Sequence, residues 1–230
     1  MDQNPLAPNS SLFPPPPLPE GADAFAKQMH ELLDGQPKDD ATVSRALEGM
    51  HAMFDLIAAG LYNLASMLVG EGEQSVLLVE QAVATADVSA CDGPVEARKS
   101  SRLALARAAL EMIARNEPGS LAAPQGLSAP ATCIEDDDLE AAGVSAEELE
   151  RMIGGPDRLR VREWLAQLPP AVRTVFALRA VAGFTAGETA GLLADCGGPE
   201  AAGWSPQSVR ETFRQGLCSL ASQLLHAVTR

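Results

Sequence analysis

Apolar residues recur along most of the chain at spacings of three and four positions, which is the pattern of amphipathic helices. The longest such stretch covers residues 42–69, with apolar positions at Val43, Leu47, Met50, Phe54, Ile57, Leu61, Leu64 and Leu68. The other predicted helices cover 23–33, 73–86, 95–116, 157–167, 170–182, 186–194 and 206–228. Because β-branched residues form no alternating runs, the pattern predicts an all-α fold.

Two of the front helices carry clear apolar stripes. Over 73–86, Val76, Val79 and Val83 form one stripe, with Leu77 and Leu78 beside it. Over 95–116, the inward positions are Leu103, Ala106, Leu110 and Ile113, and the outward positions are Arg102, Arg107, Glu111 and Arg115. These stripes predict a compact helical bundle in the front part of the chain.

Two rear helices have strong start signals. Thr185 and Glu188 form a T-x-x-E capping box, in which each side chain bonds the other residue's backbone N–H. Ser205 is an N-cap residue, and Pro206 stands at the first helical position that follows it. Two consecutive helices with such starts predict a helix-turn-helix.

Composition divides the chain into four parts. Residues 1–40 form a proline-rich tail and a short helix, since seven of the seventeen prolines lie in the first 21 positions. Residues 41–118 form the helical bundle. Residues 119–156 read as an acidic flexible linker, in which Ser145 and Glu148 can cap a short helix. Residues 157–230 form the helix-turn-helix domain. The two small helical domains are thus joined by the acidic linker.

The net charge of −14 is unevenly distributed. Residues 1–150 hold 8 Lys and Arg against 25 Asp and Glu, a net −17, whereas residues 151–230 hold 9 Arg against 6 acids, a net +3. The acidity therefore does not exclude a nucleic-acid-binding rear domain. An acidic run such as 135–150 is usually a solvated linker, but when tethered beside a basic helix it can also compete with DNA.

The sequence lacks the motifs that mark metal sites and several classes of enzyme. The four cysteines include no C-x-x-C pair and there are only three histidines, so we expect reduced thiols and no metal site. Nucleotide-binding and hydrolase motifs are missing, so we expect neither an enzyme nor a cofactor. The chain starts without a leader pattern, and its longest charge-free apolar run, 56–70, is too short for a bilayer. These features predict a cytoplasmic protein without membrane insertion.

The last predicted helix carries the candidate chemistry. The second helix of a helix-turn-helix enters the major groove with its N-terminus first. The polar residues in its early turns are Gln207, Ser208, Arg210, Glu211 and Arg214. Arg210 and Arg214 lie one turn apart on one face, and their guanidinium groups suit phosphate or guanine. The opposite apolar stripe is Val209, Phe213, Leu217 and Leu220. A plain packing helix with two surface arginines has the same pattern.

Motif runs in the rear half resemble a known family. They read L-x-x-L-P-P-x-x-R-x-V-F-x-L-R over 165–179, G-F-T-x-x-E-x-A-x-x-L over 183–193 and S-P-Q-S-V-R-x-x-x-R-x-G-x-x-x-L over 205–220. These about 70 residues resemble region 4 of bacterial sigma factors of the extracytoplasmic-function type. More weakly, L-L-V-E-Q-A-V over 77–83 and M-I-A-R-N over 112–116 are similar to region 2 of that family.

The resemblance implies a sigma-factor-like transcription initiation protein whose partners are core RNA polymerase and promoter DNA. Region 2 of the family binds polymerase and opens DNA, and by position Leu78, Glu80 and Gln81 would lie on the polymerase-binding face. Region 4 reads promoter DNA. The DNA-binding residues implied here are Ser205, Gln207, Ser208, Arg210, Glu211, Arg214 and Arg173.

Departures from the family pattern favour an alternative. Leu77 replaces the usual acid, the usual Gln-Glu pair is inverted to Glu80-Gln81, and 95–116 holds no aromatic residue to stack on an unpaired base. The alternative is a degenerate sigma mimic that binds an anti-sigma factor or another regulator and melts no promoter. A stand-alone helix-turn-helix regulator would instead bind duplex DNA without polymerase, as a dimer.

The turn between the two motif helices is also unusual. Residues 195–204 make ten positions, where three or four are common. We expect Trp204 to fill the space beside Leu193 and so to help set the crossing angle, with a solvent-facing contact residue as the alternative.

Overall fold

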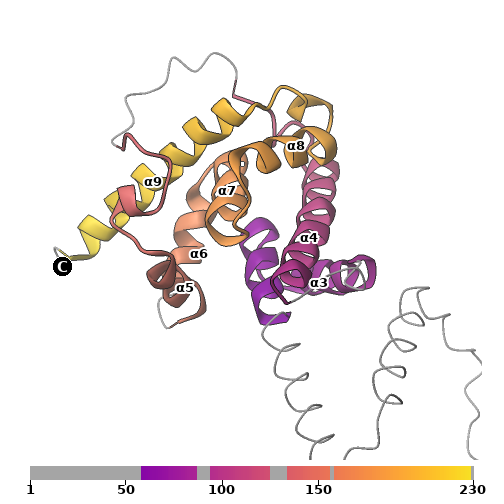
Figure 1. The fold of residues 1–230 in the computed structure, drawn as a ribbon, viewed down its shortest axis with the longest axis horizontal. Coiled ribbons are helices and arrows are strands. Elements are labelled where there is room, and N and C mark those ends of the chain that lie inside the picture. The colour runs from indigo at the N-terminus through magenta and orange to yellow at the C-terminus, as the bar shows by residue number, and fades with distance from the viewer. Residues whose placement is uncertain (1–57, 87–93, 125–133, 156–157, 229–230) are drawn as a thin grey trace, which may run out of the picture. The chain divides into compact units, whose positions relative to one another are not determined.

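A computed structural model describes residues 58–86, 94–124, 134–155 and 158–228, and every regular element in these ranges is a helix (Figure 1). Residues 58–69 are helical. The elements that follow are α3 (Glu73–Thr85), α4 (Pro94–Asn116), η1 (Glu140–Ala142), α5 (Ala146–Gly154), α6 (Arg158–Gln167), α7 (Pro170–Phe176), η2 (Ala177–Val181), α8 (Ala186–Cys196), η3 (Pro199–Ala201) and α9 (Pro206–Val228). The all-α prediction is confirmed for these ranges. The predicted proline-rich tail and the helix over 23–33 lie outside them.

Where the predicted helices lie within the described ranges, their boundaries agree with the structure to within about two residues, and the part of the 42–69 helix before residue 58 lies outside those ranges. The short helix after Ser145 exists as α5, with the predicted capping box. The Glu148 N–H donates to Ser145 Oγ at 3.1 Å, and the Ser145 N–H donates to Glu148 Oε2 at 2.9 Å. The backbone hydrogen bond from Ser145 is the main cause that lowers the pKa of Glu148. One difference is that the predicted helix 170–182 continues beyond Phe176 as a π-helical turn, η2.

The helix over 58–69 ends at a glycine. Gly70 has a φ of 88°, a left-handed conformation that glycine adopts without steric penalty. Its N–H donates to the Ser66 carbonyl at 3.0 Å, which closes the helix. The hydroxyl of Ser75 donates to the Gly70 carbonyl, so the first turn of α3 is bonded to the same corner.

The buried face of α3 differs from the predicted one. Ser75, Leu78 and Ala82 are fully or almost fully buried, and α3 packs against α4. By contrast, the exposed apolar side chains on this helix are Val76 (45% exposed), Leu77 (50%) and Val83 (60%). The expectation that the valine stripe is the packing face is therefore wrong, because the side with the short residues Ser75 and Ala82 packs closely around Leu78.

The stripe of α4 follows the prediction more closely. The buried side chains are Leu105, Ala106, Ala108, Ala109, Leu110 and Ile113, whereas Leu103 is only partly buried. Arg107, Glu111 and Arg115 are exposed, as expected, whereas Arg102 is half-buried and donates to the Ala182 carbonyl at 3.4 Å.

An aromatic cluster holds the rear helices together. Trp164 of α6 meets the ring of Phe176 edge-on at 5.0 Å between centroids, and Phe176 lies 5.7 Å from Phe213 of α9. A Cβ on Gly216 would lie 3.1 Å from the Phe176 ring, so this glycine lets α9 approach α7 closely. The predicted inward stripe of α9 is confirmed, since Val209, Phe213, Leu217 and Leu220 are all buried.

Contacts join the front helices to the predicted helix-turn-helix. α4 packs against α8, and the indole N–H of Trp204 donates to the buried carbonyl of Leu121 at 2.8 Å. The Ala123 N–H donates to the Glu200 carbonyl at 3.4 Å. Trp204 is buried, as expected, and the long turn that contains it includes η3. The turn is therefore braced by the segment that follows α4. The division into two domains stays a prediction.

Candidate nucleic-acid interface

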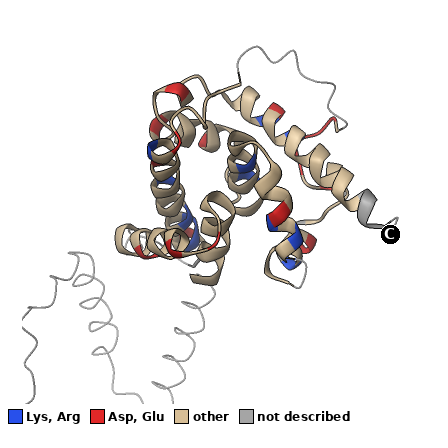
Figure 2. Cartoon of the chain, turned by 180° about the vertical axis from the view of Figure 1, so that it is seen from behind, with Lys and Arg blue, Asp and Glu red and all other residues tan. Residues whose placement is uncertain are grey.

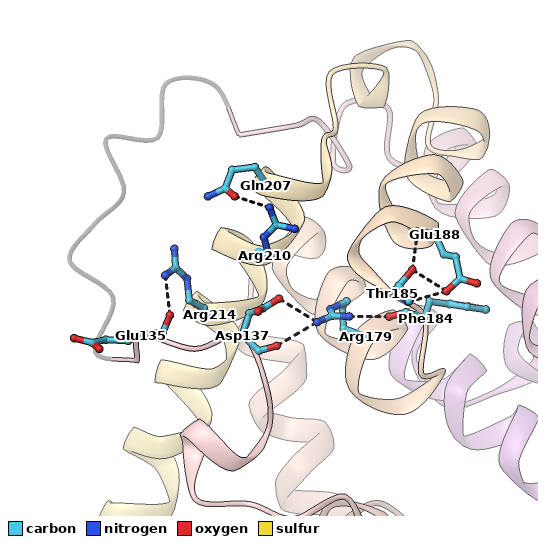
Figure 3. A network of polar contacts seen from close by, with 9 residues as sticks. All are labelled: Glu135, Asp137, Arg179, Phe184, Thr185, Glu188, Gln207, Arg210 and Arg214. Atoms are coloured by element: carbon cyan, nitrogen blue, oxygen red, sulfur yellow. Dashed lines mark hydrogen bonds and ion pairs between the residues drawn. The ribbon is translucent and has the colours of Figure 1, made fainter.

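The first helix of the motif, α8, begins with the predicted capping box (Figure 3). The Glu188 N–H donates to Thr185 Oγ1 at 3.2 Å, and the Thr185 N–H donates to Glu188 Oε2 at 2.8 Å. Glu188 also forms an ion pair with Lys99 of α4 at 2.7 Å. The hydrogen bond from Lys99, followed by those from Thr185, lowers the pKa of Glu188 to about 2.

The second helix, α9, begins with two serines that cap each other. The Ser208 N–H donates to Ser205 Oγ at 3.1 Å, and the Ser205 N–H donates to Ser208 Oγ at 2.9 Å. Both residues were predicted to contact DNA. Their hydroxyls hold the first turn of α9, so they fix where the following side chains lie.

Four polar side chains share one face of α9. Gln207, Arg210, Glu211 and Arg214 are spaced by three and four positions, and so lie side by side along the helix. Arg210 Nη2 donates to Gln207 Oε1 at 2.7 Å, and Gln207 Nε2 donates to Glu211 Oε1 at 2.7 Å. Gln207 is exposed and Arg210 is half-buried. The structure therefore brings four of the predicted DNA-binding residues together.

Arg214 has a partner that sequence reasoning missed. Its Nη1 donates to the backbone carbonyl of Glu135 at 3.0 Å (Figure 3). Glu135 belongs to residues 134–139, which we call the acidic strap. In Figures 1 and 2 this acidic segment runs alongside α9, and η1, which follows it, also contacts α9. A flexible linker was expected here.

A second arginine binds the same strap. Arg179 Nη2 donates to Asp137 Oδ2 at 3.1 Å and to the Asp137 carbonyl at 3.2 Å. Its Nη1 donates to the Phe184 carbonyl at 3.1 Å, and the guanidinium lies 5.1 Å from the ring centroid of Phe213. Arg179 thus joins the strap, the turn before α8 and the buried side of α9.

The sequence did contain a signal for this docking. Ile134 and Val144 flank the acidic residues, and both are buried, at 7% and 3% exposed. Apolar residues on both sides of an acidic run are expected where the run is fastened to a core, whereas a solvated linker needs none.

Arg173 lies in a different setting from the α9 arginines. It is half-buried on α7 and lines a pocket of about 280 Å³ with Met67 of the first described helix and Arg162 and Glu163 of α6. The structure does not place Arg173 in the polar network of α9.

The three predicted polymerase-binding residues do not all lie on the surface. Leu78 is fully buried, so it is a core residue and the prediction that it lies on a binding face is wrong. Glu80 and Gln81 are exposed on α3. The exposed leucine on this helix is Leu77, because Leu78, one position later, faces the core.

The chain matches no family model, no curated protein and no solved structure. Within the described ranges no three metal-ligating side chains are grouped to hold an ion, and no helix there is long and apolar enough to cross a membrane. Cys196 is a free thiol whose pKa is raised, chiefly by burial. Cys218 is disulfide-bonded, so the expectation of four reduced thiols is wrong.

Proposed function

We propose that this chain is a sigma-factor-like transcription initiation protein that binds core RNA polymerase through its front helices and promoter DNA through α9. The observation that carries the proposal is the pair of capped helices α8 and α9, with Gln207 and Arg210 together on one polar face of α9. This arrangement supports DNA reading, and the resemblance of 165–220 to sigma region 4 supports the link to polymerase.

DNA reading would follow from the geometry of the first turns of α9. The N–H groups of Ser205 and Ser208 are bonded to the two serine hydroxyls and Pro206 has no N–H, so the side chains of Gln207 and Arg210 supply the donors at this end of α9. Arg210 is then placed to bond a guanine edge or a phosphate. An arginine on a base edge is worth about 1–3 kcal/mol of discrimination, and one on a phosphate changes the salt slope by about 1.

Polymerase binding would use the exposed apolar side of α3. Val76, Leu77 and Val83 are 45–60% exposed, and Glu80 and Gln81 lie among them. Apolar side chains gathered on one side of a helix and edged by polar residues are typical of a protein–protein surface. In this proposal Leu77, in place of Leu78, is the leucine that contacts polymerase.

A titration against core RNA polymerase from the same source tests this face. The variant Leu77→Ala with Val83→Ala removes two exposed apolar side chains from α3. The matched control is Leu159→Ala with Val95→Ala, a leucine on α6 and a valine on α4 that are each more exposed than their counterparts on α3. We expect the α3 variant to weaken binding by about tenfold or more and the control by less than about twofold. Equal effects, or no saturable binding of the unmodified chain, would refute polymerase binding by α3.

A DNA titration tests α9 separately. Arg210→Ala should weaken binding to a promoter duplex in the polymerase complex by about tenfold, because it removes a contact of about 1–3 kcal/mol. The control is Arg107→Ala, an exposed arginine on α4. If the two variants bind DNA equally well, α9 is not the reading helix.

A sigma mimic is the second candidate. α4 contains no aromatic residue that could stack on an unpaired base. Such a protein would bind an anti-sigma factor through its fold and would not need Arg210 or Arg214 for activity. A double Arg→Ala variant at these two positions that keeps full activity in cells would support the mimic and refute the DNA reader.

A further inference from the structure

The acidic strap is bonded to the polar face of α9. Gln207, Arg210 and Arg214 share one face, and the strap is bonded to the last of them through the Glu135 carbonyl. We propose that the strap is an autoinhibitory element, which competes with DNA phosphates for Arg214 and repels them from α9. This inference rests on the proposed binding of DNA by α9.

Helix geometry places the strap where DNA would lie. Arg214 follows Gln207 by seven positions, which is about 10 Å along the axis of an α-helix. The major groove is about 12 Å wide. A helix that inserts Gln207 and Arg210 into the groove therefore brings Arg214, and the strap bonded to it, against the phosphates at the edge of the groove.

The charges of the strap oppose phosphate at this place. Glu135, Asp136 and Asp138 are exposed, and Asp137 is half-exposed. Arg179 neutralises Asp137, while the Asp138 carboxylate accepts from the Ala141 N–H at 2.8 Å. Glu135 and Asp136 are both exposed, and they are the two residues joined by the peptide group whose carbonyl Arg214 binds. Bound DNA would have to approach these two negative charges.

The acidic residues of the strap can leave α9 without dismantling the core beneath it. Arg179 has two further contacts, the hydrogen bond to the Phe184 carbonyl and its place over the Phe213 ring, that do not depend on Asp137. Ile134 and Leu139, at the two ends of the strap, pack in the core that also holds Val209 and Leu217, so these ends stay anchored. Release of residues 135–138 between them therefore exchanges a few polar contacts for phosphate contacts.

The test measures DNA affinity of the full chain with a fluorescent mixed-sequence duplex at about 50 mM salt, where phosphate contacts are strongest. The variant Glu135→Gln with Asp136→Asn removes the two exposed charges and keeps the docked backbone. The control Glu73→Gln with Glu163→Gln removes two exposed carboxylates from α3 and α6. Removal of two negative charges near the DNA phosphates should tighten duplex binding by about three- to tenfold in the strap variant. The control variant should gain much less.

Hydrogen exchange supplies a second, direct measurement. If DNA displaces the strap, saturating duplex should speed amide exchange over 134–139 while it protects the first turns of α9. Asp137→Asn, which breaks the ion pair with Arg179, should speed the same amides without DNA and should also tighten DNA binding.

The outcomes separate the two ideas. If all variants bind the duplex with equal affinity and exchange over 134–139 is unchanged by DNA, the autoinhibition is refuted while DNA binding by the chain stands. If no variant binds the duplex, with or without polymerase, both the autoinhibition and the proposed DNA reading are refuted.

Discussion

The hydrogen bond between Trp204 and Leu121 offers a sharp test of how the turn of the motif is held. Trp204→Phe keeps an aromatic ring in the site but deletes the indole N–H that donates to the Leu121 carbonyl at 2.8 Å. Leu121 is 1% exposed, so water cannot replace the lost donor. An orphaned buried acceptor costs about 1–3 kcal/mol, and the smaller ring leaves a void worth roughly 1–2 kcal/mol. The free energy of unfolding should therefore fall by about 2–5 kcal/mol.

The second tryptophan provides a matched control. Trp164 is as buried as Trp204, at 5% against 6% exposed, and its indole N–H donates to the hydroxyl of Ser219 at 2.9 Å. Ser219 is half-buried, so its hydroxyl can turn to water when the donor is lost. Trp164→Phe should then lower the free energy of unfolding by only about 1–2 kcal/mol, most of which comes from the void that the smaller ring leaves.

Urea unfolding followed by far-UV circular dichroism compares the two variants on one scale. We expect Trp204→Phe to lower the unfolding free energy by at least about 1 kcal/mol more than Trp164→Phe does. Equal losses would mean that the Leu121 carbonyl finds another donor and that the turn is not braced by this bond. In Trp204→Phe, the fluorescence of the remaining Trp164 reports on the aromatic cluster with Phe176. A separate, earlier transition of that signal would show that the rear helices unfold on their own.

Two further predictions concern the cap of α8 and the core of α3. Because the folded pKa of Glu188 is about 2, below its ordinary 4.5, its stabilising contribution is present above about pH 4.5 and is lost as the pH falls toward 2. Glu188→Gln should therefore lower the free energy of unfolding at pH 7 by about 1 kcal/mol or less, since the carboxylate is partly exposed. Urea titrations should show the difference in stability between the variant and the unmodified chain shrinking toward pH 2. A difference that does not change with pH would contradict the cause given for the pKa shift. Leu78→Ala should cost about 2–5 kcal/mol in thermal or urea unfolding because the side chain is fully buried, whereas Leu77→Ala should cost less than about 0.5 kcal/mol; similar losses would contradict the observed rotation of α3.

Helix starts were predictable because their causes are local. The side chains that cap α5 and α8 bond backbone groups three residues away, and both capping boxes are present where the T-x-x-E and S-x-x-E patterns stand. The inward stripe of α9 was predictable as well, because its apolar positions are large, regularly spaced and opposed by polar ones.

The buried face of α3 was not predictable in the same way. This helix has apolar residues on several sides, so its sequence pattern allows more than one rotation about its axis. Packing against α4 selected the side with Ser75, Leu78 and Ala82 and left Val76 and Val83 exposed. Which side a helix buries depends on its neighbour, and that information is not local.

Local patterns of residues were enough to predict the helical class, the boundaries of the described helices and the polar face of α9. The contacts made with that face and with the turn before it depend on how distant segments pack. The Glu135 carbonyl meets Arg214, Asp137 meets Arg179 and the Leu121 carbonyl meets Trp204. These partners are 79, 42 and 83 residues apart in sequence. Spacing within a helix reports on contacts over one or two turns, whereas pairs so far apart are selected by the packing of the whole fold.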